Sequence, residues 1–355
     1  MPRSKCAPPS NGSRKSIVWH TRNCSPRNAP CSARRNAAHR ARPHRFCRRG
    51  LIHEDWLVDR LEFWALRFAV ALLGSLPRSW ALRIGAALGT LLYYLVWPYR
   101  RRGLTHLAWA FPDRSPSELR SILRASARNL GRMAAEICHF PALTQESVGR
   151  YVRIGNPELW QQVVAARGQR GLVVLTAHFG NWELLAYAHG LLGVPVALIH
   201  RPMRNRLVDE WIVRWRQRAG TRSIAKKAAA KEALKVLRQG GILAIPADQN
   251  QRHSFGVFVD FFGRAACTTT GPVRLAAHSG ALIVPVFLRR VGETDQHVVE
   301  VFPPVELVHT GDPQRDLVEN TQRCTKVIEE IIRTYPEQWI WFHQRWKTRP
   351  PEERR

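Results

Sequence analysis

A histidine followed five residues later by a glutamate is the first pair in this sequence whose residue types could do chemistry. The stretch from Leu175 to Ala186 reads LTAHFGNWELLA, so His178 and Glu183 interrupt a largely apolar run. On a single helix the two side chains would point about 140° apart. Gly180 eases a tight turn, and Asn181 is a good helix N-cap. The spacing therefore predicts a strand that ends near His178 and a helix whose first turn brings Glu183 back toward the imidazole.

Such a pair could act as an activated general base. The carboxylate of Glu183 would hold one ring nitrogen of His178, while the other nitrogen takes a proton from a hydroxyl that attacks an acyl carbonyl. The same spacing also arises by chance, and a histidine at a strand end can be purely structural. His189 and His200 lie nearby, but neither has an acidic residue at comparable spacing in such a turn. Spacing alone leaves both interpretations open.

Further polar residues follow other apolar stretches. Asp248 and Gln249 come at the end of ILAIPADQ, and Arg201 and Arg204 follow VPVALIH. If these stretches are parallel strands, their carboxyl ends share one edge of the sheet, where ligands of such sheets bind. We therefore expect these side chains to lie near His178.

A second group of residues could hold an anion. Arg264 is expected on a glycine-containing loop, and Thr268 to Gly271 precede a helix that has Pro272 near its start. Hydroxyls, backbone N–H groups and a helix N-terminus together bind anions, and an arginine can add a charged clamp. An ordinary capped helix after a surface loop fits the same residues.

The elements that must position these residues alternate from about residue 151 onward. We predict strands at about 171–178, 194–200, 242–249, 281–290 and 297–307. Helices are predicted at about 181–192, 205–220, 226–241, 270–280 and 313–335. Short apolar strands that alternate with helices indicate an α/β domain with a largely parallel sheet, which we place at residues 151–350.

The preceding residues divide into two predicted parts. Residues 51–102 are predicted to be a membrane-anchoring hydrophobic segment, because Ile84 to Tyr99 is free of charge and three arginines follow at once. A buried core hairpin is the alternative, and a span or a position in one leaflet is left open. Residues 103–150 are predicted to be a helical linker region, since Ser115, Pro116 and Glu118 form a helix-start signal.

The charge of the chain is strongly basic and unevenly distributed. The formal net charge is +28, and residues 1–50 hold thirteen Lys and Arg but no Asp or Glu. We predict a disordered basic tail there, with nucleic-acid binding, a solvated extension or a misplaced start as alternative explanations. The seven cysteines show no compact spacing with histidines, so we predict no metal site. No nucleotide-binding glycine motif is present, and no cofactor is predicted.

Five motifs together resemble the bacterial lipid A biosynthesis acyltransferase family, the lauroyl and myristoyl transferases. They are HFGNWE, HRPMRN, ADQN, VDFFGRAACTTTGP and EQWIWFHQRWKTRP, in this order, and the resemblance covers about residues 55–350. It implies a three-layer αβα domain with N-terminal membrane-anchoring helices. It also implies that His178 is the general base and Glu183 its partner. The residues expected to bind the substrate or acyl donor are Asn181, Arg201, Asp248, Gln249, Arg264, Thr269, Thr270 and Gly271.

The resemblance implies transfer of a fatty acyl chain from acyl carrier protein or acyl-CoA to a hydroxyl of a lipid A precursor or related glycolipid. The protein would then work at the phospholipid bilayer of the bacterial inner membrane, with its catalytic domain on the cytoplasmic side and without nucleic acid. HFGNWE also resembles acyltransferases of phosphatidylinositol mannosides and other lipids. Two hypotheses of other classes are a basic nucleic-acid-binding protein, through the tail and the aromatic C-terminal motif, and a non-catalytic membrane scaffold.

Overall fold

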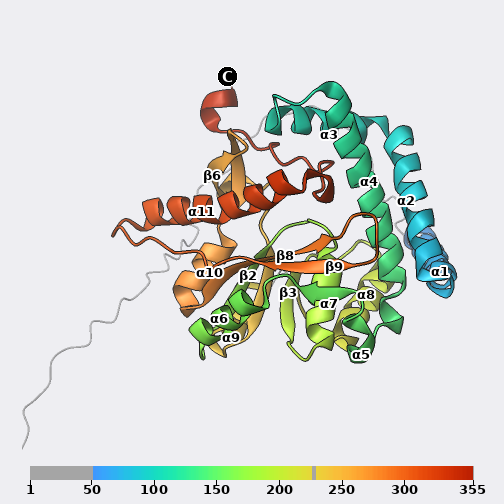
Figure 1. Cartoon of the computed structure of the whole chain (residues 1–355), viewed down its shortest axis with the longest axis horizontal. Helices are drawn as coiled ribbons and strands as arrows, with labels where there is room; N and C mark the ends of the chain where they lie inside the picture. The colour runs from blue at the N-terminus through green and yellow to red at the C-terminus, as the bar shows by residue number, and fades with distance from the viewer. Residues whose placement is uncertain (1–50, 226–228, 355) are drawn as a thin grey trace, which may run out of the picture. The chain divides into compact units, whose positions relative to one another are not determined.

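A seven-stranded sheet is the centre of the computed structural model, which describes residues 51–225 and 229–354 (Figure 1). The strand order is β1-β9-β8-β2-β5-β3-β4. Strands β8, β2, β5, β3 and β4 are parallel, while β9 runs antiparallel to β8 and pairs in parallel with β1. The strands are β1 (Val152–Ile154), β2 (Leu172–Thr176), β3 (Val196–His200), β4 (Arg222–Ala225), β5 (Ile242–Pro246), β8 (Leu282–Arg290) and β9 (His297–Val301). The predicted α/β class with a largely parallel sheet is confirmed.

The register of the two central strands decides where the site lies. All five residues of β2 are buried, as expected for a parallel strand covered on both faces. Thr176 of β2 pairs with Pro246 of β5. His178 and Asp248, each two residues further along, therefore leave the same edge of the sheet side by side.

Helices cover both faces of the sheet. Alternate residues of β2 pack on opposite sides: Val173 belongs to the core shared with α9, α10 and α11, while Val174 belongs to the core shared with α6 and α7. The helices of this part are α5 (Gln145–Val148), α6 (Pro157–Arg167), α7 (Trp182–Leu191), α8 (Arg206–Arg218), α9 (Ala229–Arg238), α10 (Gly271–Ser279) and α11 (Pro313–Thr334). Short 3₁₀ turns lie at Phe140–Ala142, His253–Phe255, Pro336–Gln338 and Pro351–Arg354.

Four further helices precede the sheet, and α2 and α4 lie side by side in Figure 1. They are α1 (Leu51–Ser75), α2 (Arg78–Leu95), α3 (Trp97–Ala110) and α4 (Pro116–Cys138). The predicted helix start at Ser115 is confirmed, because its hydroxyl accepts from the N–H of Glu118 and the Glu118 carboxylate accepts from the N–H of Ser115. Glycines allow α2 and α4 to approach closely: a Cβ added at Gly131 would lie 2.0 Å from the carbonyl oxygen of Gly85.

The predicted membrane anchor at residues 51–102 is broken into three helices. Judged by length and composition, no single helix in the described part of the chain could cross a membrane. Helices α2 and α3 satisfy that test only as a pair, and the pair is bent by 91°. Spanning anchor helices are thus not supported. The predicted basic tail, residues 1–50, lies outside the described residues.

Two parts of the fold differ from the sequence prediction. Strands β6 (Gly256–Phe261) and β7 (Arg264–Thr269) form an antiparallel hairpin where a loop was expected. The hairpin turns at Phe262 and Gly263, whose φ values of 58° and 73° are those of a tight two-residue turn. Strands β1 and β4 were also missed, because each is only three or four residues long.

The close approach of α2 and α4 yields a prediction about stability. Gly131→Ala would force the two backbones apart, so we expect the free energy of unfolding to fall by about 1–3 kcal/mol. Gly149→Ala is the matched control, because a Cβ there meets nothing within 4 Å and the backbone is helical. Chemical denaturation followed by circular dichroism measures both. Equal stability of the two variants would contradict the packing described here.

Candidate active site

The imidazole of His178 is held by the carboxylate of Asp248. Oδ1 of Asp248 lies 2.9 Å from Nδ1 of His178, and Oδ2 accepts the backbone N–H of His178 at 3.0 Å. Oδ2 also accepts the indole N–H of Trp339 at 2.8 Å. Both oxygens are therefore used, and the imidazole is fixed by a carboxylate that the strand register placed beside it.

These contacts set the charge states of the pair. Burial lowers the pKa of His178, but the charge of Asp248 and its hydrogen bond outweigh burial and raise the pKa above its ordinary value. Burial alone would raise the pKa of Asp248, but His178 and Trp339 hold that pKa at about 2. Asp248 is thus a fixed anion that stabilises the imidazolium form of His178.

The second ring nitrogen of His178 faces Gln249. The side-chain nitrogen of Gln249 lies 3.2 Å from Nε2 of His178. The amide N–H donates there, so Nδ1 carries the ring proton toward Asp248 and Nε2 keeps its lone pair. The buried Arg345 fixes this segment by donating to the carbonyl oxygens of Gln249 and of Cys267 in β7. The site therefore presents a basic nitrogen at Nε2.

Glu183 is not the hydrogen-bond partner of His178, contrary to the sequence prediction. It does lie in the first turn of α7, but its carboxylate forms a two-pronged ion pair with Arg216 of α8: Nη2 donates to Oε1 at 2.7 Å and Nε donates to Oε2 at 3.2 Å. The ring nitrogen that it was expected to hold is already bonded to Asp248. The charge of Glu183 still contributes through space to the raised pKa of His178.

A cavity of about 230 Å³ opens beside this pair, between the sheet and helices α7 and α8. His178, Glu183, Arg201 and Arg216 line it together with apolar side chains. The apolar lining comes mainly from Val174, Leu185, Ala186, Val196, Leu198, Ile199, Met203, Ile212 and Ala244. The arrangement suits a ligand with a hydrocarbon chain and a reactive polar end. Arg201 lies where predicted, whereas Arg204 pairs with Glu62 of α1 at 2.6 Å.

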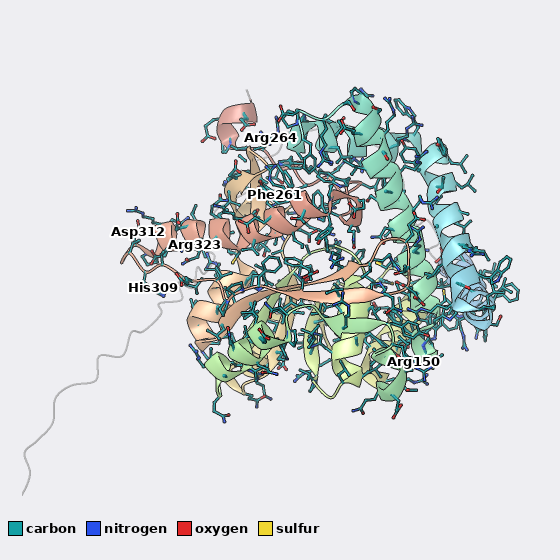
Figure 2. The ribbon with its side chains drawn as sticks, in the orientation of Figure 1. Arg150, Phe261, Arg264, His309, Asp312 and Arg323 are labelled. Carbon is teal, nitrogen blue, oxygen red and sulfur yellow. The ribbon has the colours of Figure 1, made fainter. Side chains whose placement is uncertain are left out.

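The second predicted group, the anion site, is not brought together. Arg264, labelled in Figure 2, begins β7 at the turn of the hairpin. Its guanidinium lies 4.4 Å from the ring centroid of Trp109. Thr269 ends the same strand, and six residues of extended chain keep the two about 16 Å apart. The hydroxyl of Thr270 accepts from Nε of Arg274, and that of Thr269 accepts the N–H of Gly271, so both hydroxyls are bonded within the start of α10.

Asn181 is confirmed as the N-cap of α7, since its side-chain oxygen accepts the N–H of Leu184 at 3.0 Å. Its amide nitrogen donates to Glu136 of α4 at 2.7 Å. Asn181 is fully buried, so both ends of the side chain are used inside the protein. It therefore positions the turn after His178 rather than facing a substrate.

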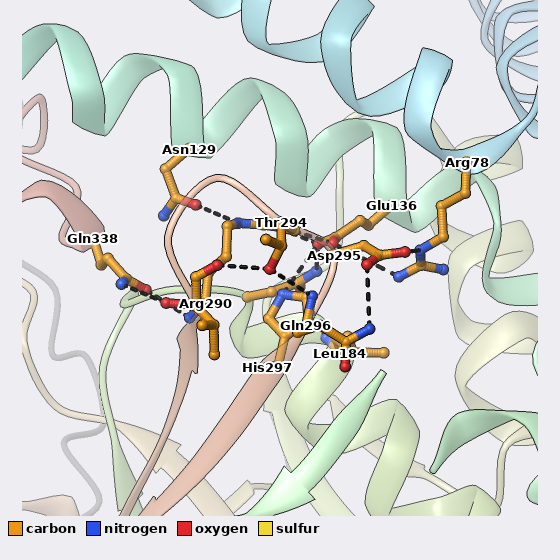
Figure 3. Close-up of polar contacts among 12 residues, drawn as sticks. Arg78, Asn129, Glu136, Leu184, Arg290, Thr294, Asp295, Gln296, His297 and Gln338 are labelled. Atoms are coloured by element: carbon orange, nitrogen blue, oxygen red, sulfur yellow. Dashed lines mark hydrogen bonds and ion pairs between the residues drawn. The ribbon is translucent and has the colours of Figure 1, made fainter. Parts of the chain in front are cut away.

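A buried charge cluster around Glu136 and Arg290 is drawn in Figure 3. Through Glu136 it contacts Asn181 of that turn. Both oxygens of Glu136 accept from the guanidinium of Arg290 at 2.7 Å, and Asn129 accepts from Arg290 at 2.8 Å. Burial would raise the pKa of Glu136, but His297 and Arg290 hold it at about 2. Gln338 links this cluster to the turn. Its side-chain amide bonds the backbone N–H and carbonyl of Arg290, and its backbone carbonyl accepts the N–H of Gly180.

Metal ligands are absent from the part of the chain that the structure describes: no three His, Cys, Asp or Glu side chains come together there in a group that could hold an ion.

The family model for bacterial lipid A biosynthesis acyltransferases matches residues 52–348. The chain belongs to this family. It is 29% identical over 303 residues to the lipid A biosynthesis lauroyltransferase of Escherichia coli (strain K12), covering 84% of this chain and 94% of that protein. Identity to the lipid A biosynthesis myristoyltransferase of the same strain is 24%, over 82% of this chain and 90% of that protein. A lipid A biosynthesis acyltransferase of Haemophilus influenzae (strain ATCC 51907 / DSM 11121 / KW20 / Rd) is 24% identical, over 84% of this chain and 92% of that protein.

Sequence reasoning missed several residues of this candidate site. Trp339 was not among the predicted site residues, yet its indole N–H donates a hydrogen bond to the carboxylate of Asp248. Glu136 and Arg290 carried no motif, although a glutamate among apolar positions of an amphipathic helix is a signal for a buried ion pair. Arg216 was placed on a helix but given no partner. Each of these contacts joins segments that are distant in the sequence.

The buried cluster yields a prediction about the acyltransferase scaffold. Glu136→Ala leaves the guanidinium of Arg290 buried without its carboxylate, so we expect the free energy of unfolding to fall by about 3–5 kcal/mol. Glu293→Ala is the control, because the carboxylate that it removes pairs with Arg128 and Arg132 but is 64% exposed. This change should lower the free energy of unfolding by at most about 1 kcal/mol. Denaturant titration measures both. A Glu136→Ala variant as stable as Glu293→Ala would contradict a structural role for the cluster.

Proposed function

We propose that this acyltransferase moves a fatty acyl chain from an acyl thioester to a hydroxyl of a lipid A precursor, with His178 as the general base. The observation that carries the proposal is the basic Nε2 of His178 at the mouth of an apolar cavity, with Nδ1 held by a buried carboxylate. The family and the names of its relatives support lipid A biosynthesis as the pathway. The acyl chain would occupy the cavity between the sheet and helices α7 and α8.

The reaction follows from this geometry. The acceptor hydroxyl takes the place of Gln249 at Nε2 of His178 and gives up its proton as its oxygen attacks the thioester carbonyl carbon. The new C–O bond gives a tetrahedral intermediate, and Asp248 stabilises the imidazolium that has formed. Collapse of the intermediate breaks the C–S bond, and the imidazolium returns the proton to the leaving sulfur. The products are an ester and a thiol, so no cofactor is consumed.

The partners of the reaction are part of the same proposal. The donor is acyl carrier protein or acyl-CoA, and the basic side chains Arg201 and Arg216 at the cavity suit the phosphate of either carrier. The pair of Arg216 with Glu183 holds that guanidinium at the rim. Glu183 thus retains a role in the site through Arg216 and through its charge.

Work at the inner membrane, with the site facing the cytoplasm, is supported by the surface of the first helices. Large apolar side chains are exposed there on three successive helices, including Trp64 and Phe68 of α1, Leu92 of α2 and Trp97 of α3. Aromatic residues followed by Arg100 to Arg102 suit the headgroup region of an anionic bilayer. A membrane-bound acceptor could then reach His178 without leaving the lipid.

Substitution of the base tests the proposal. We expect His178→Ala to lower kcat for acyl transfer by about 10²- to 10⁴-fold, because the hydroxyl loses its proton acceptor. Purified full-length protein would be assayed by mass spectrometry of the lipid product, with both acyl carrier protein and acyl-CoA donors. The control is His278→Ala, since His278 is an exposed histidine of α10 that does not line the cavity.

Circular dichroism and thermal melting would establish that both variants fold. Full activity of a folded His178→Ala protein would remove His178 as the base. If the unmodified protein transferred the acyl chain from neither donor, the thioester chemistry would be contradicted.

A further inference from the structure

A second hollow lies outside the His178 cavity, between helices α1, α2 and α4. It has a volume of about 700 Å³, and almost all of its surface is apolar. Leu66 and Val70 of α1, Leu88 of α2 and Leu130 and Ala134 of α4 are among the side chains that line it. We call this hollow the α1–α2–α4 groove. None of its lining residues belongs to the His178 cavity.

A cationic pocket of about 460 Å³ lies beside α3, and we call it the α3 pocket. Arg101, Arg102 and Lys347 line it, and its lining includes no acidic residue. Within residues 51–225 and 229–354, none of these three cations has a carboxylate within ion-pair distance. Trp346 lines the same pocket and is 96% buried, and its indole N–H has no hydrogen-bond acceptor among the residues that the structure describes. The pocket thus holds positive charge that no carboxylate of the described residues neutralises.

The groove and the pocket adjoin each other. The guanidinium of Arg102, in the pocket, lies 5.1 Å from the ring centroid of Tyr99, which lines the groove. Arg102 also donates to the carbonyl oxygen of Phe342 at 3.2 Å, and Phe342 lines the groove. The apolar groove and the cationic pocket are therefore neighbours, separated by Arg102 and the residues that it contacts.

We infer that the α1–α2–α4 groove and the α3 pocket together bind one membrane lipid that carries a phosphate group. Its hydrocarbon chains lie in the groove, and its phosphate contacts Arg101 and Lys347. Arginine and ammonium groups favour phosphate oxygens, and the groove removes the chains from water. This site goes beyond the proposed function, because it lies apart from His178 and does not require acyl transfer.

The inference is tested by binding of dihexanoyl phosphatidic acid, a short-chain lipid that dissolves as a monomer. Full-length protein would be titrated by calorimetry with this lipid, with glycerol 3-phosphate and with dihexanoylglycerol. The intact lipid should bind at least about tenfold more tightly than either part, because only the lipid fills both hollows. Glycerol 3-phosphate binding as tightly as the lipid would overturn the inference, since the groove would then contribute nothing.

Two variants locate the binding. Arg101→Gln with Lys347→Gln should weaken binding of the lipid by about tenfold or more. Arg315→Gln with Lys326→Gln is the matched control, because it removes one arginine and one lysine that are exposed on α11. Ala134→Trp places an indole in the groove from an exposed position of α4 and should weaken the lipid but not glycerol 3-phosphate.

Equal weakening by the Arg101/Lys347 and Arg315/Lys326 pairs would show general attraction to a basic protein and would overturn the site. A His178→Ala protein should bind the lipid as the unmodified protein does, and loss of binding in that variant would place the lipid in the catalytic cavity instead. Alkylation of Cys138, which lines the groove, gives a second measurement: the lipid should slow it, as read from the peptide that contains Cys138. Because none of these measurements depends on turnover, their failure is distinct from failure of the acyltransferase proposal.

Discussion

The site depends on one constraint: both oxygens of the buried Asp248 carboxylate must accept hydrogen bonds. Asp248 stays ionised in the interior because His178 and Trp339 supply three donors to its two oxygens. An unpaired charge in that position would be very costly. The ends of β2 and β5 and the segment after α11 therefore have to meet at one point. The same contacts that keep Asp248 charged also fix the ring of His178 with Nε2 free to accept a proton.

The turn that carries His178 is held by a second buried charge on the opposite side. Glu136 of α4 reaches Asn181, the N-cap of α7, and Arg290, the last residue of β8. Gln338 connects this cluster to Gly180 and lies next to Trp339. Gly180 itself is required, because its φ is 56° and a Cβ would lie 1.8 Å from the carbonyl oxygen of Leu288. The turn that carries His178 is thus held both by α4, which precedes the sheet, and by Gln338, which follows it.

Local sequence predicted the features that depend on local physics. The alternation of apolar strands with helices, the N-cap at Asn181 and the capping box at Ser115 need only neighbouring residues, and all three are confirmed. The nearness of Asp248 to His178 followed from parallel strands that share an edge. The partner of Glu183 could not be predicted, because it depends on how α8 lies over α7 and brings Arg216 within reach. The hairpin of β6 and β7 was missed because Gly263 was taken as a sign that Arg264 lies on a loop.

The central claim is that Asp248, and not Glu183, holds His178 and sets its basicity. It is tested by the pH dependence of kcat/KM for the unmodified protein, Asp248→Asn and Glu183→Gln. Because Asp248 raises the pKa of His178, the unmodified protein should gain activity through a pKa above the ordinary value of about 6.5. Asp248→Asn should move this rise in kcat/KM to lower pH, and Glu183→Gln should move the rise by a smaller amount. A larger displacement by Glu183→Gln, with no displacement by Asp248→Asn, would contradict the account.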